Sequence, residues 1–236
     1  MNSPAVCCLD KPHGAGAQRP ESSATASAAF FLSIEFQETG YLVYRFYKAG
    51  YGNINGLPVP LRLNEFLPDT QQIGKGVVVG VGDWQAQLEA NKQSYAVDFV
   101  TRTRFTTAYP NSMTPAQFVD ALFLAAGVTP TATERTAAMS EFGTAATSSD
   151  SAARARSLRR VAENSTLNVH EYNKAFVLMQ YFGYLRRNPN DAPDVDFGGF
   201  NFWLGKLNEF NGNFVTAEMV KAFITSGEYR GRFGTN

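Results

Sequence analysis

The chain has 236 residues, with 21 basic and 21 acidic side chains and 44% hydrophobic residues. A chain of this length buries roughly 70% of its unfolded surface on folding, so it can form a substantial core. The balanced charge provides no global positive field, which argues against nucleic acid as a partner. No apolar run reaches the length of a membrane span, and the opening segment lacks the apolar stretch of a signal peptide.

Residues 1–28 are rich in Ala, Ser, Gly and Pro, and we expect them to be a disordered leader. Cys7 and Cys8 lie here side by side, where they are poorly placed to bond to each other and cannot complete a tetrahedral zinc site alone. The rest of the chain contains no cysteine. The fold is therefore predicted to use neither disulfides nor cysteine-bound metal.

An aromatic motif recurs in residues 30–36, 99–105 and 223–229, with an aromatic residue at its first and last positions. Such self-similarity predicts a repeated structural unit. Glu228 stands in the last copy where Arg104 stands in the middle copy. This exchange argues for a structural role of the position, such as a hydrogen bond at a helix end, and against a catalytic one.

Other stretches align in the same order: residues 41–47 match 176–182, and residues 84–88 match 203–207. The second match places one Trp and one Leu a helical turn apart. Apolar residues recur every three or four positions, which favours helices over strands. The unit is therefore predicted as an aromatic helix, a Pro-rich connection, a Trp-bearing helix and an aromatic-ended closing helix. Residues 118–123 form an intermediate copy of the first helix.

Helix starts are predicted where a capping residue is followed three positions later by Glu or Gln. These pairs are Thr114 with Gln117, Thr131 with Glu134, and Asn168 with Glu171. A further helix is predicted over residues 152–163, after a polar loop at 143–151. It carries four arginines, which we interpret as a solvated helix face: Arg154, Arg156, Arg159 and Arg160.

Residues 74–82 differ from the rest because they are rich in Gly and Val. This composition predicts either a short β-hairpin or a loop. A phosphate-binding loop is disfavoured, because that motif needs Gly-Lys-Ser/Thr at the start of a helix and this stretch reads Gly-Lys-Gly.

Three motifs, in residues 176–191, 199–207 and 226–234, resemble the bacterial "domain of unknown function 4214" family. The resemblance is strong over residues 175–234 and partial over 29–110. It implies an all-helical module repeated in large secreted or surface proteins of bacteria, and it transfers no catalytic residue. The closing motif is also distantly similar to phycobilisome linker domains, which join protein subunits.

We therefore expect an all-α chain of imperfect helical repeats in four parts. They are a leader at 1–28, a repeat with the remnant of a preceding unit at 29–110, a helical linker or degenerate repeat at 111–174, and a repeat of the family type at 175–236. The remnant suggests a piece of a longer protein.

An acidic cluster lies in the last Pro-bearing connection: Asp191, Asp194 and Asp196. Clustered carboxylates suit Ca²⁺, although the EF-hand pattern fails because Gly205 stands at the twelfth position, where Glu is required. A hydrolase that pairs one of these acids with Glu209 or Glu228 is a weaker alternative, since one flexible turn does not form a cleft. We interpret the stretch as a turn, with Ca²⁺ as the alternative and no other cofactor.

Aromatic residues follow this cluster: Phe200, Phe202 and Trp203. They can form a platform for a sugar or a partner, but their helical spacing and the match of Trp203 to Trp84 favour the core. The one histidine outside the leader, His170, lies near a predicted helix start, so no His-based triad is expected.

These features predict a non-enzymatic interaction or assembly module of a secreted or cell-surface bacterial protein, with protein partners or a surface polymer. Carbohydrate or envelope-polymer binding through exposed aromatic residues is the alternative, and hydrolysis is the least favoured function.

Overall fold

The computed structural model describes residues 36–234, and every regular element in this range is helical. The predicted all-α class is confirmed. No helix in this range is both long enough and apolar enough to cross a membrane. The predicted leader, with Cys7 and Cys8, and residues 29–35 of the remnant predicted at 29–39 lie outside the described residues.

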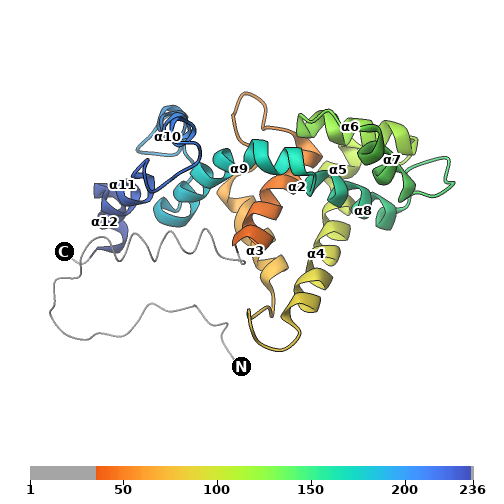
Figure 1. Ribbon diagram of the computed structural model, residues 1–236, viewed down its shortest axis with the longest axis horizontal. Coiled ribbons are helices and arrows are strands. Elements are labelled where there is room, and N and C mark those ends of the chain that lie inside the picture. The colour runs from red at the N-terminus through yellow and green to blue at the C-terminus, as the bar shows by residue number, and fades with distance from the viewer. Residues whose placement is uncertain (1–35, 235–236) are drawn as a thin grey trace.

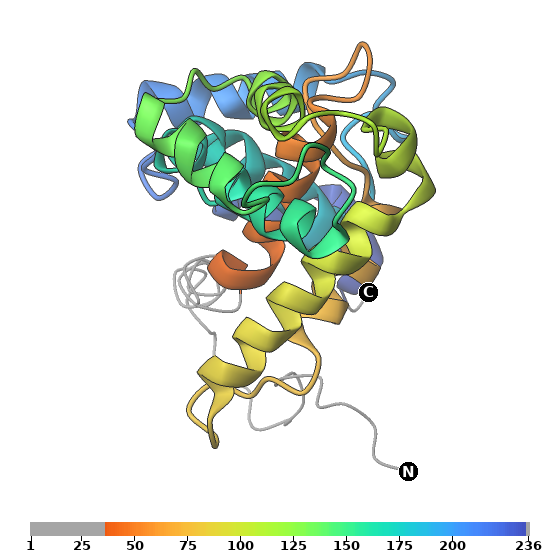
Figure 2. The same cartoon turned by 90° about the vertical axis from the view of Figure 1, so that its right-hand side faces the viewer.

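The first half of the structure is built around one central helix. The π-helical segment η1 (Phe36–Gly40) runs directly into α2 (Tyr41–Tyr51). After a loop, α3 (Leu63–Gly74) and α4 (Trp84–Thr101) pack together as a projecting arm, and the short helix α5 (Thr103–Ala108) follows a kink (Figure 2).

The second half begins with α6 (Pro115–Ala126), α7 (Ala132–Ser140) and α8 (Ser151–Ala162). Helices α6 and α8 pack on the first half, and α7 packs on α6 and α8. The long helix α9 (Ser165–Gln180) continues as the π-helical segment η2 (Tyr181–Leu185). The chain closes with α10 (Gly198–Glu209), α11 (Met219–Thr225) and α12 (Gly227–Phe233), which lie together at one end of the molecule (Figure 1).

Helix α2 lies at the centre of the core, where it contacts α3, α6, α8 and α9. Its side chains are apolar or aromatic around almost the whole helix, a pattern typical of a buried helix. Tyr44 and Phe46 on opposite sides of it are fully buried. Burial of a large aromatic side chain contributes roughly 2–3 kcal/mol, so this helix is the main apolar anchor of the fold.

Two of the three predicted helix starts are confirmed by reciprocal capping bonds at Thr114 and Thr131. The third is wrong, because α9 begins at Ser165 and Asn168 lies inside it. Asn164 caps the helix instead, since its Oδ1 accepts hydrogen bonds from the amides of Thr166 and Leu167 at 2.9 and 3.2 Å. An Asn at this position satisfies two free amides without needing Glu three residues later.

The predicted solvated arginine face is wrong for Arg154, which is 1% exposed. Its guanidinium donates to the carbonyls of Tyr109 and Pro110 at 2.8 and 2.9 Å, also bonds Ser148, and lies 4.9 Å from the centre of the Phe118 ring. The other three arginines form ion pairs: Arg156 and Arg160 with Glu141, and Arg159 with Glu89 and Glu163.

Residues 75–83 form a loop of turns at the tip of the α3–α4 arm, so the hairpin considered for 74–82 is not present. The amide of Val77 bonds the Gly74 carbonyl at 3.1 Å, and the amide of Val81 bonds the Val78 carbonyl at 3.0 Å. Val78 and Val81 are 58% and 64% exposed. Because the loop packs on no second strand, its β-branched residues do not form a sheet.

The predicted repeat has a structural counterpart in two matching kinks. Arg102 separates α4 from α5 with φ −61° and ψ 142°, and Ser226 separates α11 from α12 with φ −61° and ψ 149°. Their amides bond the carbonyls of Phe99 and Phe223 at 3.3 and 3.2 Å. The same break in the helix therefore occurs at the same position of the motif.

Contacts around the two kinks also correspond. Phe46 and Tyr181 occupy matching positions in the aromatic helices, and they pack edge-to-face on Phe99 and Phe223 with ring centres 5.7 and 5.1 Å apart.

An ion pair accompanies each kink, but its polarity is exchanged. Arg104 pairs with Glu65 at 3.0 Å in the first unit, whereas Glu228 pairs with Arg187 at 2.7 Å in the last. In both units this position forms an ion pair next to the kink, a contact of the kind that the structural interpretation expects.

Candidate functional site

Arg187, at the end of η2, organises the last connection of the chain. It is 6% exposed, and it donates to both carboxylate oxygens of Glu228 at 2.7 and 2.9 Å and to Asp194 at 2.7 Å. Its Nη1 also donates to three carbonyls, those of Asn188, Pro189 and Asp191, at 3.1, 3.2 and 3.0 Å. A planar guanidinium fork can hold so many acceptors at once, and a lysine ammonium cannot.

The same contacts set the charge state of the site. Burial acts to lower the pKa of Arg187, but hydrogen bonds with Glu228 and Asp194 outweigh burial, so this pKa is raised. In return, the hydrogen bond from Arg187 lowers the pKa of Glu228. Both groups are therefore held in their charged forms.

The three aspartates of the predicted acidic cluster face different partners. Asp191 accepts from the backbone and side-chain amides of Asn188 at 2.9 and 2.7 Å. Asp194 accepts from Arg187, and Asp196 accepts from the Gly198 amide at 2.7 Å. Within residues 36–234 no three His, Cys, Asp or Glu side chains form a group that can hold a metal ion. The three carboxylates therefore do not form one group among the described residues.

The aromatic candidates are divided between core and surface. Phe200 is fully buried, Phe202 is 57% exposed, and Trp203 is half-buried with its ring centre 5.7 Å from that of Phe223. Phe200 is therefore in the core, as expected, but Phe202 is not, because it lies on the exposed side of α10.

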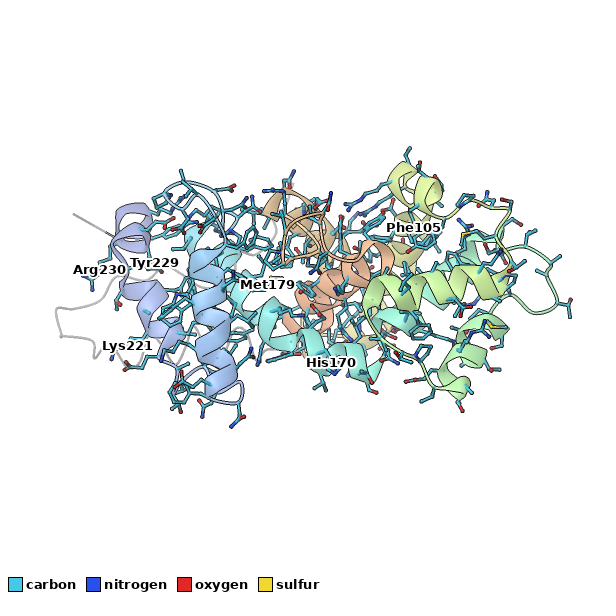
Figure 3. The ribbon with its side chains drawn as sticks, turned by 90° about the horizontal axis from the view of Figure 1, so that it is seen from above. Phe105, His170, Met179, Lys221, Tyr229 and Arg230 are labelled. Carbon is cyan, nitrogen blue, oxygen red and sulfur yellow. The ribbon has the colours of Figure 1, made fainter. Side chains whose placement is uncertain are left out.

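Glu209 and Glu228, the two glutamates of the hydrolase hypothesis, are each held in an ion pair. Glu209 pairs with Lys206 at 3.0 Å on α10, and Glu228 pairs with Arg187. His170 lies on the exposed side of α9, near the middle of the molecule in Figure 3. Of the pairs in the hydrolase hypothesis, Asp194 and Glu228 lie close together, because both accept hydrogen bonds from Nη2 of Arg187, at 2.7 and 2.9 Å. The Arg187 guanidinium forms ion pairs with both carboxylates.

A hollow of about 770 Å³ lies between two connections, the one after α2 and the one that leads to α10. Figure 2 shows these two loops near each other, the first in orange and the second in blue. Both follow matching aromatic helices, so the hollow forms between equivalent parts of two repeat units. The lining residues are Asn53, Ile54, Asn55, Gly56, Leu57, Pro58, Asn190, Val195, Asp196, Phe197 and Asn201.

The walls of the hollow are fixed by hydrogen bonds. In the first connection, the Ile54 amide bonds the Val59 carbonyl at 2.9 Å, and the turn between them contains Gly56 at φ 75°, a backbone conformation that favours glycine. The Leu63 amide donates to Asn188 Oδ1 at 2.9 Å and so joins the two connections. Arg187 fixes the second connection through its hydrogen bonds to three backbone carbonyls of that connection. A ligand therefore meets a largely preformed surface.

The chemistry of the lining is amide-rich and weakly charged. Four asparagines contribute side-chain amides, each of which can donate and accept. Asp196 is the single ionisable side chain among these lining residues, and Val195 is 90% exposed. Asn190 Oδ1 is enclosed and has no hydrogen-bond partner among residues 36–234. The hollow can therefore bind amide or hydroxyl groups together with small apolar side chains, but it contains no acid–base pair.

Sequence reasoning did not identify this hollow, because its two walls lie more than a hundred residues apart. The available signal was the asparagine content of both connections, at Asn53 and Asn55 and again at Asn190 and Asn201. That signal becomes specific only once the two loops are known to meet.

Comparison with known proteins finds no matching family model, no matching curated protein and no matching solved structure. The resemblance to the "domain of unknown function 4214" family rests on the sequence motifs alone.

Proposed function

We propose that this chain is a non-enzymatic protein-interaction module whose hollow binds an extended segment of a partner protein. The observation that carries the proposal is the lining itself, in which four side-chain amides lie among apolar groups with a single carboxylate. The family resemblance extends the proposal to a secreted or cell-surface bacterial protein.

An extended peptide matches this lining in two respects. Its backbone offers alternating N–H and C=O groups, which side-chain amides such as Asn55 and Asn201 can pair with. Its side chains can contact the apolar groups of Ile54, Leu57 and Val195. The volume of about 770 Å³ lies within the usual range for small-ligand and peptide sites.

Enzymatic function is disfavoured by what surrounds the carboxylates. General acid–base catalysis needs a second group within hydrogen-bond reach of the reacting proton. Asp196 has no such partner in the lining, and the charges of Asp194 and Glu228 are compensated by Arg187.

Binding of a carbohydrate or envelope polymer is the second candidate, because amide side chains also pair with hydroxyl groups and Phe202 is exposed. Sugar sites commonly offer an exposed aromatic face for stacking. The one aromatic residue in the lining, Phe197, is only 9% exposed, so the lining favours a peptide.

The test selects heptapeptides from a random display library on the full chain and measures their affinity by fluorescence anisotropy. The double variant Asn55→Ala/Asn201→Ala should weaken binding about 10- to 30-fold, because each lost hydrogen bond contributes roughly 1 kcal/mol. Asn168→Ala, an exposed asparagine on α9, is the matched control and should bind as the wild type does.

Soluble glycans are titrated in parallel, with tryptophan fluorescence as the readout. Failure to select any saturable peptide, or equal affinity of the double variant and the wild type, would exclude the peptide proposal. Glycan binding that the double variant abolishes would replace it with the carbohydrate alternative.

A further inference from the structure

The last aromatic residue of the repeated motif is buried in two copies but not in the third. Phe36 is 5% exposed and Phe105 is fully buried, whereas Tyr229 is only half-buried. Phe233, one helical turn after Tyr229, is 52% exposed. Helix α12 therefore presents an aromatic surface at a position that is covered elsewhere in the same chain.

The middle copy shows what covers this position. The ring of Phe105 stacks on Tyr109 at 4.6 Å and meets Phe118 edge-to-face at 6.1 Å. Phe118 belongs to α6, an amphipathic helix that places Phe118, Val119 and Leu122 in the core and leaves Asp120 exposed. The cover is thus an amphipathic helix with an aromatic anchor.

In the last copy, the inner side of α12 is occupied and its outer side is not. Tyr229 packs on Tyr184 toward the core, with ring centres 5.9 Å apart, and on Phe233 along the helix at 5.1 Å. Arg230 is exposed and forms no ion pair with any residue in the range 36–234. Figure 3 shows Tyr229 and Arg230 at one end of the molecule, away from Phe105.

Helix α12 itself carries a net positive charge. Helix α12 carries Arg230 and Arg232, and its one acid, Glu228, is already shared between Arg232 and Arg187. Phe233 follows Tyr229 by four residues and Arg230 by three, so its side chain neighbours both on the helix surface. Two aromatic residues beside the exposed Arg230 complement a helix with an apolar face and acidic flanks.

We propose that the surface formed by Tyr229, Arg230 and Phe233 docks an acidic amphipathic helix of a partner protein. The helix seats its aromatic anchor against Tyr229 and Phe233, as α6 seats Phe118 against Phe105, and its carboxylates face Arg230. This site shares no residue with the hollow and does not depend on the peptide proposal.

The chain supplies its own template for the probe, a peptide of residues 114–128, which contain α6. The probe carries the substitutions Gln117→Glu and Leu124→Glu at two exposed positions and a fluorescent label, and it is titrated against the full chain by anisotropy. A second peptide with Lys at positions 117, 120 and 124 serves as the charge-reversed probe and should bind at least tenfold more weakly.

Two exposed positions of the site are changed separately, so that the fold is preserved. Phe233→Ser and Arg230→Glu should each weaken binding of the acidic probe at least tenfold. Val215→Ser removes an apolar side chain that is 69% exposed elsewhere on the surface, and it should leave binding unchanged. The hollow variant Asn55→Ala/Asn201→Ala should also bind the probe normally.

Saturable binding of the acidic probe that is lost in Phe233→Ser and kept in Val215→Ser supports the proposal. Absence of saturable binding, equal affinity for both probes, or equal losses in Phe233→Ser and Val215→Ser would overturn it. Light scattering on the full chain tests whether a second copy of this chain occupies the site instead. A concentration-dependent dimer that Phe233→Ser abolishes would identify a second copy as the partner and exclude the one proposed.

Discussion

Two buried arginines, Arg154 and Arg187, have different kinds of partner. Arg187 faces the carboxylates of Glu228 and Asp194, whereas Arg154 faces only carbonyl and hydroxyl oxygens and an aromatic ring. Burial lowers the pKa of Arg154, because its side-chain partners include no carboxylate. Both residues join segments that are distant in sequence. Each side chain stabilises the fold by donating to several oxygen atoms at once.

Arg187→Lys tests this role. Lysine keeps the charge but loses the planar fork, so several of the six hydrogen bonds cannot form. We expect the free energy of unfolding, measured with urea, to fall by about 2–3 kcal/mol. The neighbouring Arg186 is exposed, so Arg186→Lys should change the stability by less than about 0.5 kcal/mol. Equal effects of the two substitutions would contradict the role assigned to Arg187.

The burial of Arg154 marks a limit of sequence reasoning at this scale. Arg154, Arg156, Arg159 and Arg160 follow one another on a helix, and nothing local distinguishes the first. It is buried because the loops that contain Tyr109 and Ser148 close over it. The asparagines that line the hollow are not predictable for the same reason, because the hollow forms only where the two connections meet.

At the scale of elements, helix boundaries were predictable where the signal was local and had no competitor. Thr114 and Thr131 each cap a helix as expected, because the capping residue and its partner lie within one turn. The helix start predicted at Asn168 was wrong because Asn164, four residues earlier, provides the same capping side chain. The closing kinks were predictable as a recurring motif, although the break within each copy was not.

Helix α12 is tied to the last connection by Glu228, which gives this element a pH dependence. The hydrogen bond from Arg187 lowers the pKa of Glu228 below its ordinary value of 4.5. The unfolded chain therefore binds this proton more tightly than the folded chain does. Its stabilising contribution is complete above about pH 4.5 and is lost as the pH falls through the lower folded value.

Glu228→Gln isolates this contribution. At pH 7 the variant should be less stable than the wild type, and the difference between them should shrink as the pH falls from about 5 to about 3. Urea unfolding at several pH values measures the difference. A constant difference over this range would show that the carboxylate charge has no part in holding α12.

At the scale of the whole molecule, the helices are unequally connected. Helix α2 packs on both the first unit and the α6–α8 segment, whereas α10, α11 and α12 pack chiefly on α9 and η2 (Figure 1). Elements with fewer long-range contacts open at lower free energy than those in the centre of a core. The end that carries the proposed helix-docking site is therefore the less stable part.

Hydrogen exchange followed by mass spectrometry measures this difference directly. We expect amides of α2, α6 and α8 to exchange at least about tenfold more slowly than those of α10, α11 and α12. The acidic probe peptide should slow exchange in α12 and leave α2 unchanged. Uniform exchange along the chain would mean that the structure opens only as one cooperative unit.

The exchanged polarity of the two kink ion pairs has a consequence for correct pairing during folding. If the closing helices were swapped between the two units, Arg104 would meet Arg187 and Glu228 would meet Glu65. Each wrong pairing would bring like charges together, while each correct one joins opposite charges at 2.7 to 3.0 Å. The two copies share one backbone geometry but have opposite charges at the matching positions. Each of the two closing helices therefore forms a favourable ion pair only within its own unit.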